Sequence, residues 1–156
     1  MNKNKKYRPN VGIMIINKKK EIFVGQRLDH PSHFWQMPQG GIDSKETALN
    51  AALRESVEET GIKKSNLKLT AETKDWHYYD LPLDLAKTLW NGKYIGQKQK
   101  WFLFEFLGTK KDINVNTKNP EFSEYKWVNK LFLEPNIVPF KRPIYKKILE
   151  EFKKYL

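Results

Sequence analysis

The sequence predicts a layered α/β fold, and three observations support this prediction. Several segments rich in β-branched and aromatic residues lie between polar or Gly/Pro-containing stretches, as strands do. Two segments, 45–60 and 142–156, carry apolar residues at helical spacing. The 156 residues are 39% hydrophobic, without repeats or linkers, which suits one core. We therefore predict a single domain, 1–156, in which helices flank a mixed sheet.

The strands are predicted from apolar runs and the turns between them. Segments 11–16 and 21–26 are apolar and separated by NKKK, so we expect them to pair as a hairpin. The remaining predicted strands are 67–72, 75–80, 99–107 and 125–129.

The predicted helix at 45–60 has start and stop signals and two different faces. Asp43 or Ser44 can cap it, with Glu46 at capping-box spacing, and Gly61 stands where a C-terminal cap belongs. At about 100° per residue, one stripe is suited to burial: Leu49, Ala52, Leu53, Ser56 and Val57. Another face carries Glu55, Glu58 and Glu59, with Ala48 and Ala51 leaving room for close approach.

The three glutamates of this helix repel one another unless a counter-charge is present. Glu55 stands three and four residues before Glu58 and Glu59, and the helix dipole disfavours negative charge in its C-terminal half. A hard divalent cation, which takes oxygen ligands, would remove the conflict. The alternative is an ordinary solvated acidic face.

Composition limits the partners and the compartment. The formal charge is +11, which suits a polyanion such as RNA or a nucleotide, although lysines can also be mere solvated surface. The chain has no cysteine, and its basic N-terminus precedes only a short apolar run. We expect a cytoplasmic protein with no membrane segment and no DNA partner; protein partners are left open.

The stretch 40–62 resembles the Nudix box, in which Gly and Glu precede Arg-Glu-apolar-x-Glu-Glu-x-Gly-apolar at fixed spacing. The matching residues are Gly40, Glu46, Arg54, Glu55, Val57, Glu58, Glu59, Gly61 and Ile62. Ser56 departs from the pattern, because the family usually has an aliphatic residue there. The resemblance implies a Nudix α/β/α sandwich with a central mixed β-sheet that hydrolyses nucleoside diphosphates linked to a further group.

The resemblance also implies a metal site. Mg²⁺ or Mn²⁺, with more than one ion when substrate is bound, would be held by Gly40, Glu55, Glu58, Glu59 and Glu121, the last in the segment PEF. Arg54 would orient a box glutamate, and Glu46 would be mainly structural. The three histidines, His30, His33 and His77, match no common transition-metal ligand spacing.

Segments outside the box resemble one subgroup, the bacterial RNA pyrophosphohydrolases. They include YRPNVGIMI, GQR, WQMPQGGID, YDLP, GQKQKWF, PEFSEYKWV and VPFKRPIYKKILEEF, and together span nearly the whole chain. The resemblance implies conversion of 5′-triphosphate RNA ends to monophosphates, which promotes mRNA decay. Two alternatives remain open: hydrolysis of dinucleoside polyphosphates such as Ap4A or Ap5A, and a non-catalytic module that binds RNA ends.

Carried over to this chain, the resemblance suggests several substrate contacts. Arg8, Arg27, Gln39 and Lys141 would meet phosphate oxygens, and Phe140 would stack on a base or belong to the core. GQKQK, 96–100, would be a basic loop near the phosphates or a plain turn. Trp35, Trp101 and Trp127 are expected in the core or packed against it.

Overall fold

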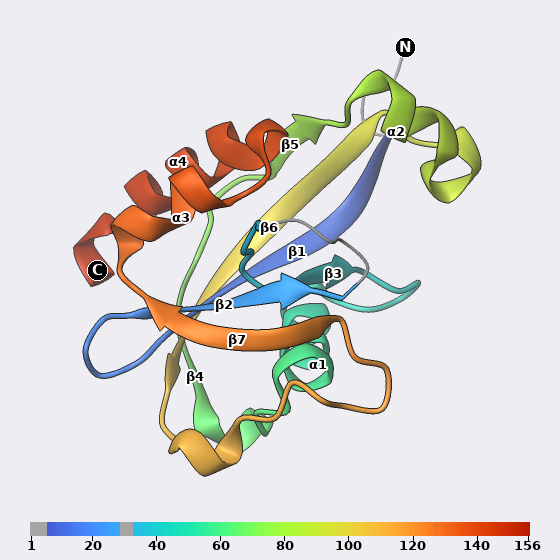
Figure 1. Cartoon of the computed structure of the whole chain (residues 1–156). Coiled ribbons are helices and arrows are strands. Elements are labelled where there is room, and N and C mark those ends of the chain that lie inside the picture. The colour runs from blue at the N-terminus through green and yellow to red at the C-terminus, as the bar shows by residue number, and fades with distance from the viewer. Residues whose placement is uncertain (1–5, 29–32) are drawn as a thin grey trace.

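The computed structural model describes residues 6–28 and 33–156, which form a mixed sheet with helices on both faces (Figure 1). The strands are β1 (Tyr7–Ile16), β2 (Ile22–Arg27), β3 (Gln39–Gly41), β4 (Leu67–Glu72), β5 (His77–Asp80), β6 (Gly96–Phe106) and β7 (Phe122–Val128). The α-helices are α1 (Ala48–Thr60), α2 (Leu83–Thr88), α3 (Lys130–Asn136) and α4 (Arg142–Glu151). Short 3₁₀ turns are η2 (Lys64–Asn66), η3 (Leu89–Gly92), η4 (Lys110–Asp112), η5 (Pro139–Lys141) and η6 (Lys153–Tyr155).

The sheet has the order β4-β6-β1-β2-β7, with β3 paired to β1 and β5 paired to β6. Its central pair, β1 and β6, is parallel from Tyr7↔Gly96 to Ile16↔Glu105, while the other pairs are antiparallel. The predicted hairpin is confirmed by the pairing Ile16↔Ile22. The predicted α/β sandwich with a mixed sheet is therefore confirmed.

Alternation along β1 supplies both cores of the sandwich. Met14 and Ile16 point to the side of α4, where they join Tyr145 and Ile148. Val11, Ile13 and Ile15 alternate with these residues along the strand and point to the side of α1. Figure 1 shows α3 and α4 on one face of the sheet and α1 on the other.

Helix α1 begins at Ala48, later than the predicted start at residue 45. Lys45 has φ 67°, which a helix cannot accommodate, and Thr47 is the N-cap, its Oγ1 accepting a bond from Asn50 N at 3.1 Å. The expected partnership of Asp43 and Glu46 exists, with Asp43 N 3.0 Å from Glu46 Oε1, but it closes the turn before the helix. Ser56 is buried as predicted, and its hydroxyl donates to Ala52 O at 2.7 Å.

Two predictions about local structure were wrong. The stretch 96–100 is the first half of β6 rather than a loop, because it pairs with β1 along its whole length. Ala51 is fully buried in the core below α1, so it leaves no approach to the carboxylates. Trp101 is fully buried, and Trp35 and Trp127 pack against the two cores, as predicted.

The remaining differences concern boundaries and short elements. β1 and β7 begin earlier than predicted, β5 begins later, and the C-terminal helix ends at Glu151 before η6. β3, α2 and α3 were not predicted. Across the residues that the structure describes, no helix has the length and apolar character needed to cross a bilayer.

Candidate active site

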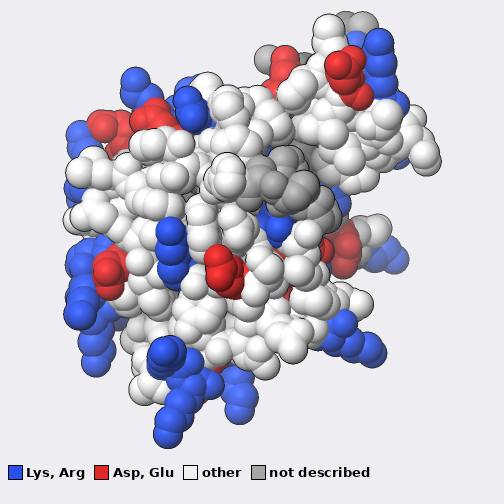
Figure 2. Space-filling view, viewed as in Figure 1, with Lys and Arg blue, Asp and Glu red and all other residues white. Residues whose placement is uncertain are grey.

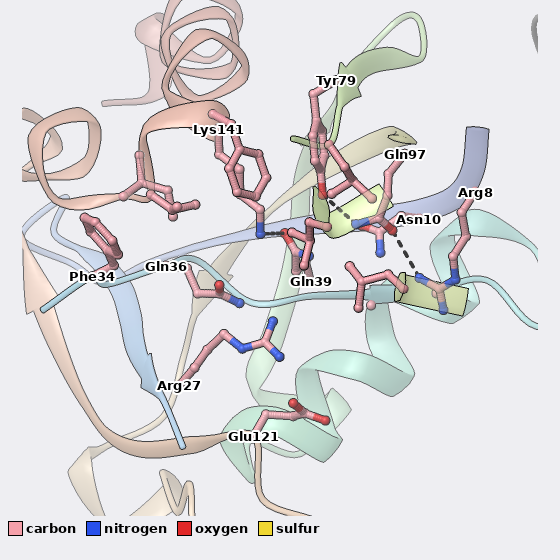
Figure 3. Close-up of a pocket in the computed structure, with 18 of the residues that line it drawn as sticks. Arg8, Asn10, Arg27, Phe34, Gln36, Gln39, Tyr79, Gln97, Glu121 and Lys141 are labelled. Carbon is pink, nitrogen blue, oxygen red and sulfur yellow. Dashed lines mark hydrogen bonds between the residues drawn. The ribbon is translucent and has the colours of Figure 1, made fainter. Parts of the chain in front are cut away.

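A pocket of about 540 Å³ opens where the N-terminal half of β1 meets β3, α1 and η5. Its lining includes every substrate-contacting residue that the sequence suggested, namely Arg8, Arg27, Gln39, Phe140 and Lys141. Gly40, Glu55, Glu59 and Glu121 line the same pocket. Figure 3 shows Glu121 and Arg27 at one end and Lys141, Gln39 and Arg8 further along. Residues far apart in the sequence thus converge on one cavity.

Glu59 is the most deeply buried of the box glutamates. Glu59 is only 3% exposed, and its Oε2 accepts a hydrogen bond from Gln39 N at 3.0 Å. Burial, and then the nearby carboxylates of Glu55 and Glu121, raise the pKa of Glu59 well above its ordinary value. A cation bound in the pocket would therefore stabilise the ionised form of Glu59.

Arg54 supplies a counter-charge inside α1 itself. Its guanidinium bonds Glu46 at 2.9 Å through both Nε and Nη2, and it donates to Gly41 O at 2.9 Å. Nη1 donates to Glu55 Oε1 at 2.8 Å and reaches Glu58 Oε2 at 3.3 Å. The Arg54 hydrogen bonds lower the pKa of Glu46 to about 2. The repulsion within the helix is therefore partly relieved by an arginine, so like-charge spacing alone does not require a metal.

Glu55 and Glu58 differ in their access to the pocket. Glu55 lines it, and burial is the largest cause that raises the pKa of Glu55, against the opposing effect of Arg54. The Glu58 side chain is 56% exposed and, with Arg54, is not among the residues that line the pocket. Glu58 thus lies outside the described pocket lining, in an ion pair with the same arginine.

Gly40 permits the close approach of β3 to α1. A Cβ on Gly40 would lie 2.0 Å from Glu55 Cδ, so any side chain there would displace this carboxylate. Gly40 stands opposite Val11 in the β1–β3 pairing. A glycine at this position therefore lets the Glu55 carboxylate keep its place against β3.

The donor set of the pocket fits a hard divalent cation. Glu55, Glu59 and Glu121 offer carboxylate oxygens, and their mutual repulsion favours a bound positive charge. Within residues 6–28 and 33–156, however, no group of three or more acidic, histidine or cysteine side chains stands in an arrangement that could already hold a metal ion, so the fit lies in the chemistry of the donors and not in their present arrangement. His77 bonds Glu151 Oε1 at 3.0 Å, which ties it to α4, and His30 lies outside the described residues.

The opposite side of the pocket is cationic and rich in amides. Lys141 is buried, and its Nζ donates to Gln39 Oε1 at 3.2 Å. Burial, and then the charge of Arg27, lower the pKa of Lys141 to about 8. Arg8 donates from Nη1 to Gln97 Oε1 at 3.1 Å, and its guanidinium lies 4.7 Å from the ring centroid of Trp90.

Apolar and aromatic side chains form the outer wall of the pocket. Phe140 is half-buried, packs against the α4-side core and lies 6.1 Å from Tyr79 between ring centroids. Phe140 therefore belongs both to the margin of the core and to the pocket lining. Sequence reasoning missed Asn10, Gln97 and Trp90 in this lining. The alternating GQKQK pattern could have shown the glutamines to share one face of a strand.

Comparison with known proteins identifies the family. The NUDIX domain family matches residues 6–148. The chain is 51% identical over 150 residues to an RNA pyrophosphohydrolase of Roseobacter denitrificans, covering 96% of this chain and 94% of the relative. It is 52% identical over 148 residues to an RNA pyrophosphohydrolase of Wolbachia sp. subsp. Brugia malayi, covering 94% and 90%.

Solved structures share the fold at much lower identity. The E. coli dihydroneopterin triphosphate pyrophosphohydrolase has a TM-score of 0.73 at 21% identity, covering 93% of this chain and 98% of that chain. A C. elegans Ap4A hydrolase has a TM-score of 0.67 at 21% identity, covering 94% and 98%. Nudix hydrolases generally use divalent metal ions. The family match covers nearly the whole chain, and the two relatives are 51% and 52% identical to it. The chain therefore belongs to the NUDIX domain family.

Proposed function

We propose that this protein hydrolyses the 5′-triphosphate of RNA and leaves a 5′-monophosphate end. The observation that carries the proposal is one pocket lined both by the carboxylates of Glu55, Glu59 and Glu121 and by the cationic side chains of Arg8, Arg27 and Lys141. Such a pocket suits a polyphosphate chain, whose oxygens need cations and directional donors. The names of the relatives at about 50% identity support RNA as the substrate.

The proposed cofactor is Mg²⁺ or Mn²⁺, with more than one ion when substrate is bound. Glu55, Glu58, Glu59 and Glu121 would hold it, with the carbonyl of Gly40. When bound, the metal neutralises phosphate charge and makes a water more acidic. Because the Glu58 side chain is paired with Arg54 at 3.3 Å and is outside the described pocket lining, it would have to leave Arg54 and turn toward the pocket to bind the metal.

The remaining residues position the substrate. Arg54 orients Glu55 through the 2.8 Å bond to Oε1, and Glu121 binds metal or helps to activate the attacking water. Arg8, Arg27, Gln39 and Lys141 contact phosphate oxygens, while Phe140 stacks on a base at the outer wall. Water adds to a phosphorus as one anhydride P–O bond breaks, releasing pyrophosphate or successive phosphates.

Diadenosine tetraphosphate and pentaphosphate are the alternative substrates, because the same chemistry would cleave their anhydrides. We expect faster turnover of 5′-triphosphate RNA than of diadenosine tetraphosphate when both are offered with Mg²⁺ at equal concentration. Preferential cleavage of the dinucleotide would instead assign the protein to the alternative substrate class.

The catalytic part of the proposal is tested with Glu58→Gln. We expect this change to lower hydrolysis by at least about 100-fold, because a neutral amide binds the cation more weakly than a carboxylate does, while the melting temperature stays near that of the wild type. Glu150→Gln is the matched control, since Glu150 is an exposed carboxylate on α4 that pairs with Lys153 at 2.7 Å. Full activity of Glu58→Gln would contradict the metal assignment; binding of RNA ends without any turnover by the wild type would favour the non-catalytic alternative.

A further inference from the structure

Buried amides lie side by side on two neighbouring strands at the pocket, where Asn10 and Gln97 belong to the lining and Gln99 does not. Asn10 of β1 stands opposite Gln99 of β6, and Arg8 stands opposite Gln97. Asn10 and Gln99 are each only 1% exposed, and Gln97 is 4% exposed. Burying several amides side by side is costly unless their hydrogen bonds are satisfied, so their partners reveal how they are arranged.

The orientation of these amides is fixed by groups that can only donate. The Trp101 indole donates from Nε1 to Gln99 Oε1 at 3.0 Å, which turns the Gln99 amide nitrogen away from it. Gln99 Nε2 then donates to Asn10 Oδ1 at 2.7 Å and toward Gln39 Oε1 at 3.4 Å. At the other end Lys141 Nζ also donates to Gln39 Oε1, at 3.2 Å. Because an indole N–H and an ammonium cannot accept, the hydrogen bonds run inward from both ends and converge on Gln39 Oε1, which must accept.

A second chain of the same kind runs beside the first. Arg8 Nη1 donates to Gln97 Oε1 at 3.1 Å, and Gln97 Nε2 donates to the hydroxyl of Tyr79. Figure 3 shows this chain and the bond from Lys141 to Gln39 as dashed lines. In both chains, the carbonyl oxygen of each amide accepts a hydrogen bond from a donor within the protein.

The consequence concerns what the pocket presents to an anion. With their carbonyl oxygens committed, Asn10 and Gln39 can turn only their NH₂ groups toward a ligand. An amide free to flip would present its oxygen, which repels phosphate, in part of the population. We propose that Asn10 is a further phosphate contact and that Gln99, oriented by Trp101, is the positioning residue that holds Asn10 and Gln39 as donors. The inference rests on the proposed function in taking the ligand to be a polyphosphate.

The test uses Gln99→Met, which keeps the volume and neutrality of the side chain but removes its hydrogen bonds. Calorimetry with inorganic tripolyphosphate on the metal-free protein measures binding without turnover. We expect Gln99→Met and Asn10→Ala each to raise the dissociation constant about 10-fold. In an Asn10→Ala/Gln39→Ala background, Gln99→Met should weaken binding no further, because Gln99 acts through those two residues.

Thr73→Val is the control for simple loss of stability. Thr73 is 2% exposed and its Oγ1 accepts a bond from Trp101 N at 3.0 Å, but it does not line the pocket. This variant should lower the melting temperature while leaving tripolyphosphate binding within about 2-fold of the wild type. Wild-type binding by Gln99→Met, or equal weakening by Thr73→Val, would overturn the inference.

Kinetics then separate this inference from the proposed function. In hydrolysis of 5′-triphosphate RNA, Gln99→Met should raise KM more than it lowers kcat, because the donors hold the bound phosphates. A wild-type protein that cleaves neither RNA nor diadenosine tetraphosphate would contradict the proposed function, while the tripolyphosphate measurement would still decide the role of Gln99.

Discussion

Lys141 is the residue whose burial has the clearest measurable effect on stability. Its pKa is lowered from 10.5 to about 8, chiefly by burial, so charging it opposes folding. The penalty is fully present below pH 8, where Lys141 is charged in both states. It is lost as pH rises from about 8 to 10.5, because only the unfolded chain then keeps the proton.

Replacing Lys141 with methionine should therefore stabilise the protein at neutral pH. The shift corresponds to about 3 kcal/mol, which is an upper bound because the bond to Gln39 is also lost. We expect the gain in unfolding free energy, measured by urea denaturation, to be largest at pH 7 and to vanish near pH 10.5. A gain independent of pH would show that the charge of Lys141 is not its cause.

The same group should set the alkaline limb of activity. If Lys141 binds phosphate as a cation, kcat/KM should fall above about pH 8, since kcat/KM reports the ionisation of the free enzyme. Lys141→Met should lower kcat/KM about 10-fold at pH 7 and lack this limb. If kcat/KM of Lys141→Met still falls above about pH 8 as in the wild type, a different group causes the decrease.

Sequence reasoning found the charged residues of the pocket lining but not how deeply each is buried. The spacing of Glu55, Glu58 and Glu59 is visible in the sequence, yet a helical wheel does not show what covers a face. β3 covers Glu59, with Gln39 N bonded to its carboxylate, while Glu58 stays exposed outside the described pocket lining. Gln97 and Gln99 were missed because an alternation of glutamine and lysine is as polar as a solvated loop.

Helix α1 depends on its C-terminal glycine. Gly61 has φ 73° and its N–H bonds Val57 O, and a Cβ there would lie 2.5 Å from Asn114 O. Gly61→Ala should therefore combine the cost of left-handed backbone with a collision against main chain. Gly92 has a similar φ of 70°, but its nearest atom to a Cβ is Lys87 O at 3.1 Å.

The two glycines thus form a matched pair for a stability measurement. We expect Gly61→Ala to lower the free energy of unfolding by about 2 kcal/mol and Gly92→Ala by about 1 kcal/mol. Thermal or urea denaturation of both variants checks the difference. Equal losses would mean that the segment around Asn114 yields to the added methyl group.

Elements with a strong period were predicted, and elements defined by tertiary contacts were not. The amphipathic helices α1 and α4 and the hairpin of β1 and β2 follow from their sequence patterns. β3 spans only Gln39–Gly41 and exists through its pairing with β1. α2 and α3 are short, and α3 contains Pro135, so neither shows a helical period long enough to recognise.

At the scale of the molecule, positive charge extends beyond the pocket. The chain has 29 Lys and Arg against 18 Asp and Glu, whereas among residues 6–28 and 33–156 the basic side chains of the pocket lining are those of Arg8, Arg27 and Lys141. Figure 2 shows Lys and Arg around much of the outline of the visible face, with fewer charges across its centre. Such a distribution can attract an RNA chain before its 5′ end reaches the pocket.

The contribution of this outer charge can be measured by salt dependence. A triphosphorylated dinucleotide reaches little beyond the pocket, whereas a 20-nucleotide RNA can also meet the outer lysines. If it does, log KM should rise more steeply with log salt concentration for the longer RNA, by about 0.7 for each additional phosphate contact. As the salt concentration rises from about 50 to 200 mM, the KM of the longer RNA should approach that of the dinucleotide, because the outer contacts are screened. Parallel slopes for the two RNAs would confine recognition to the pocket and leave the excess charge as solvated surface.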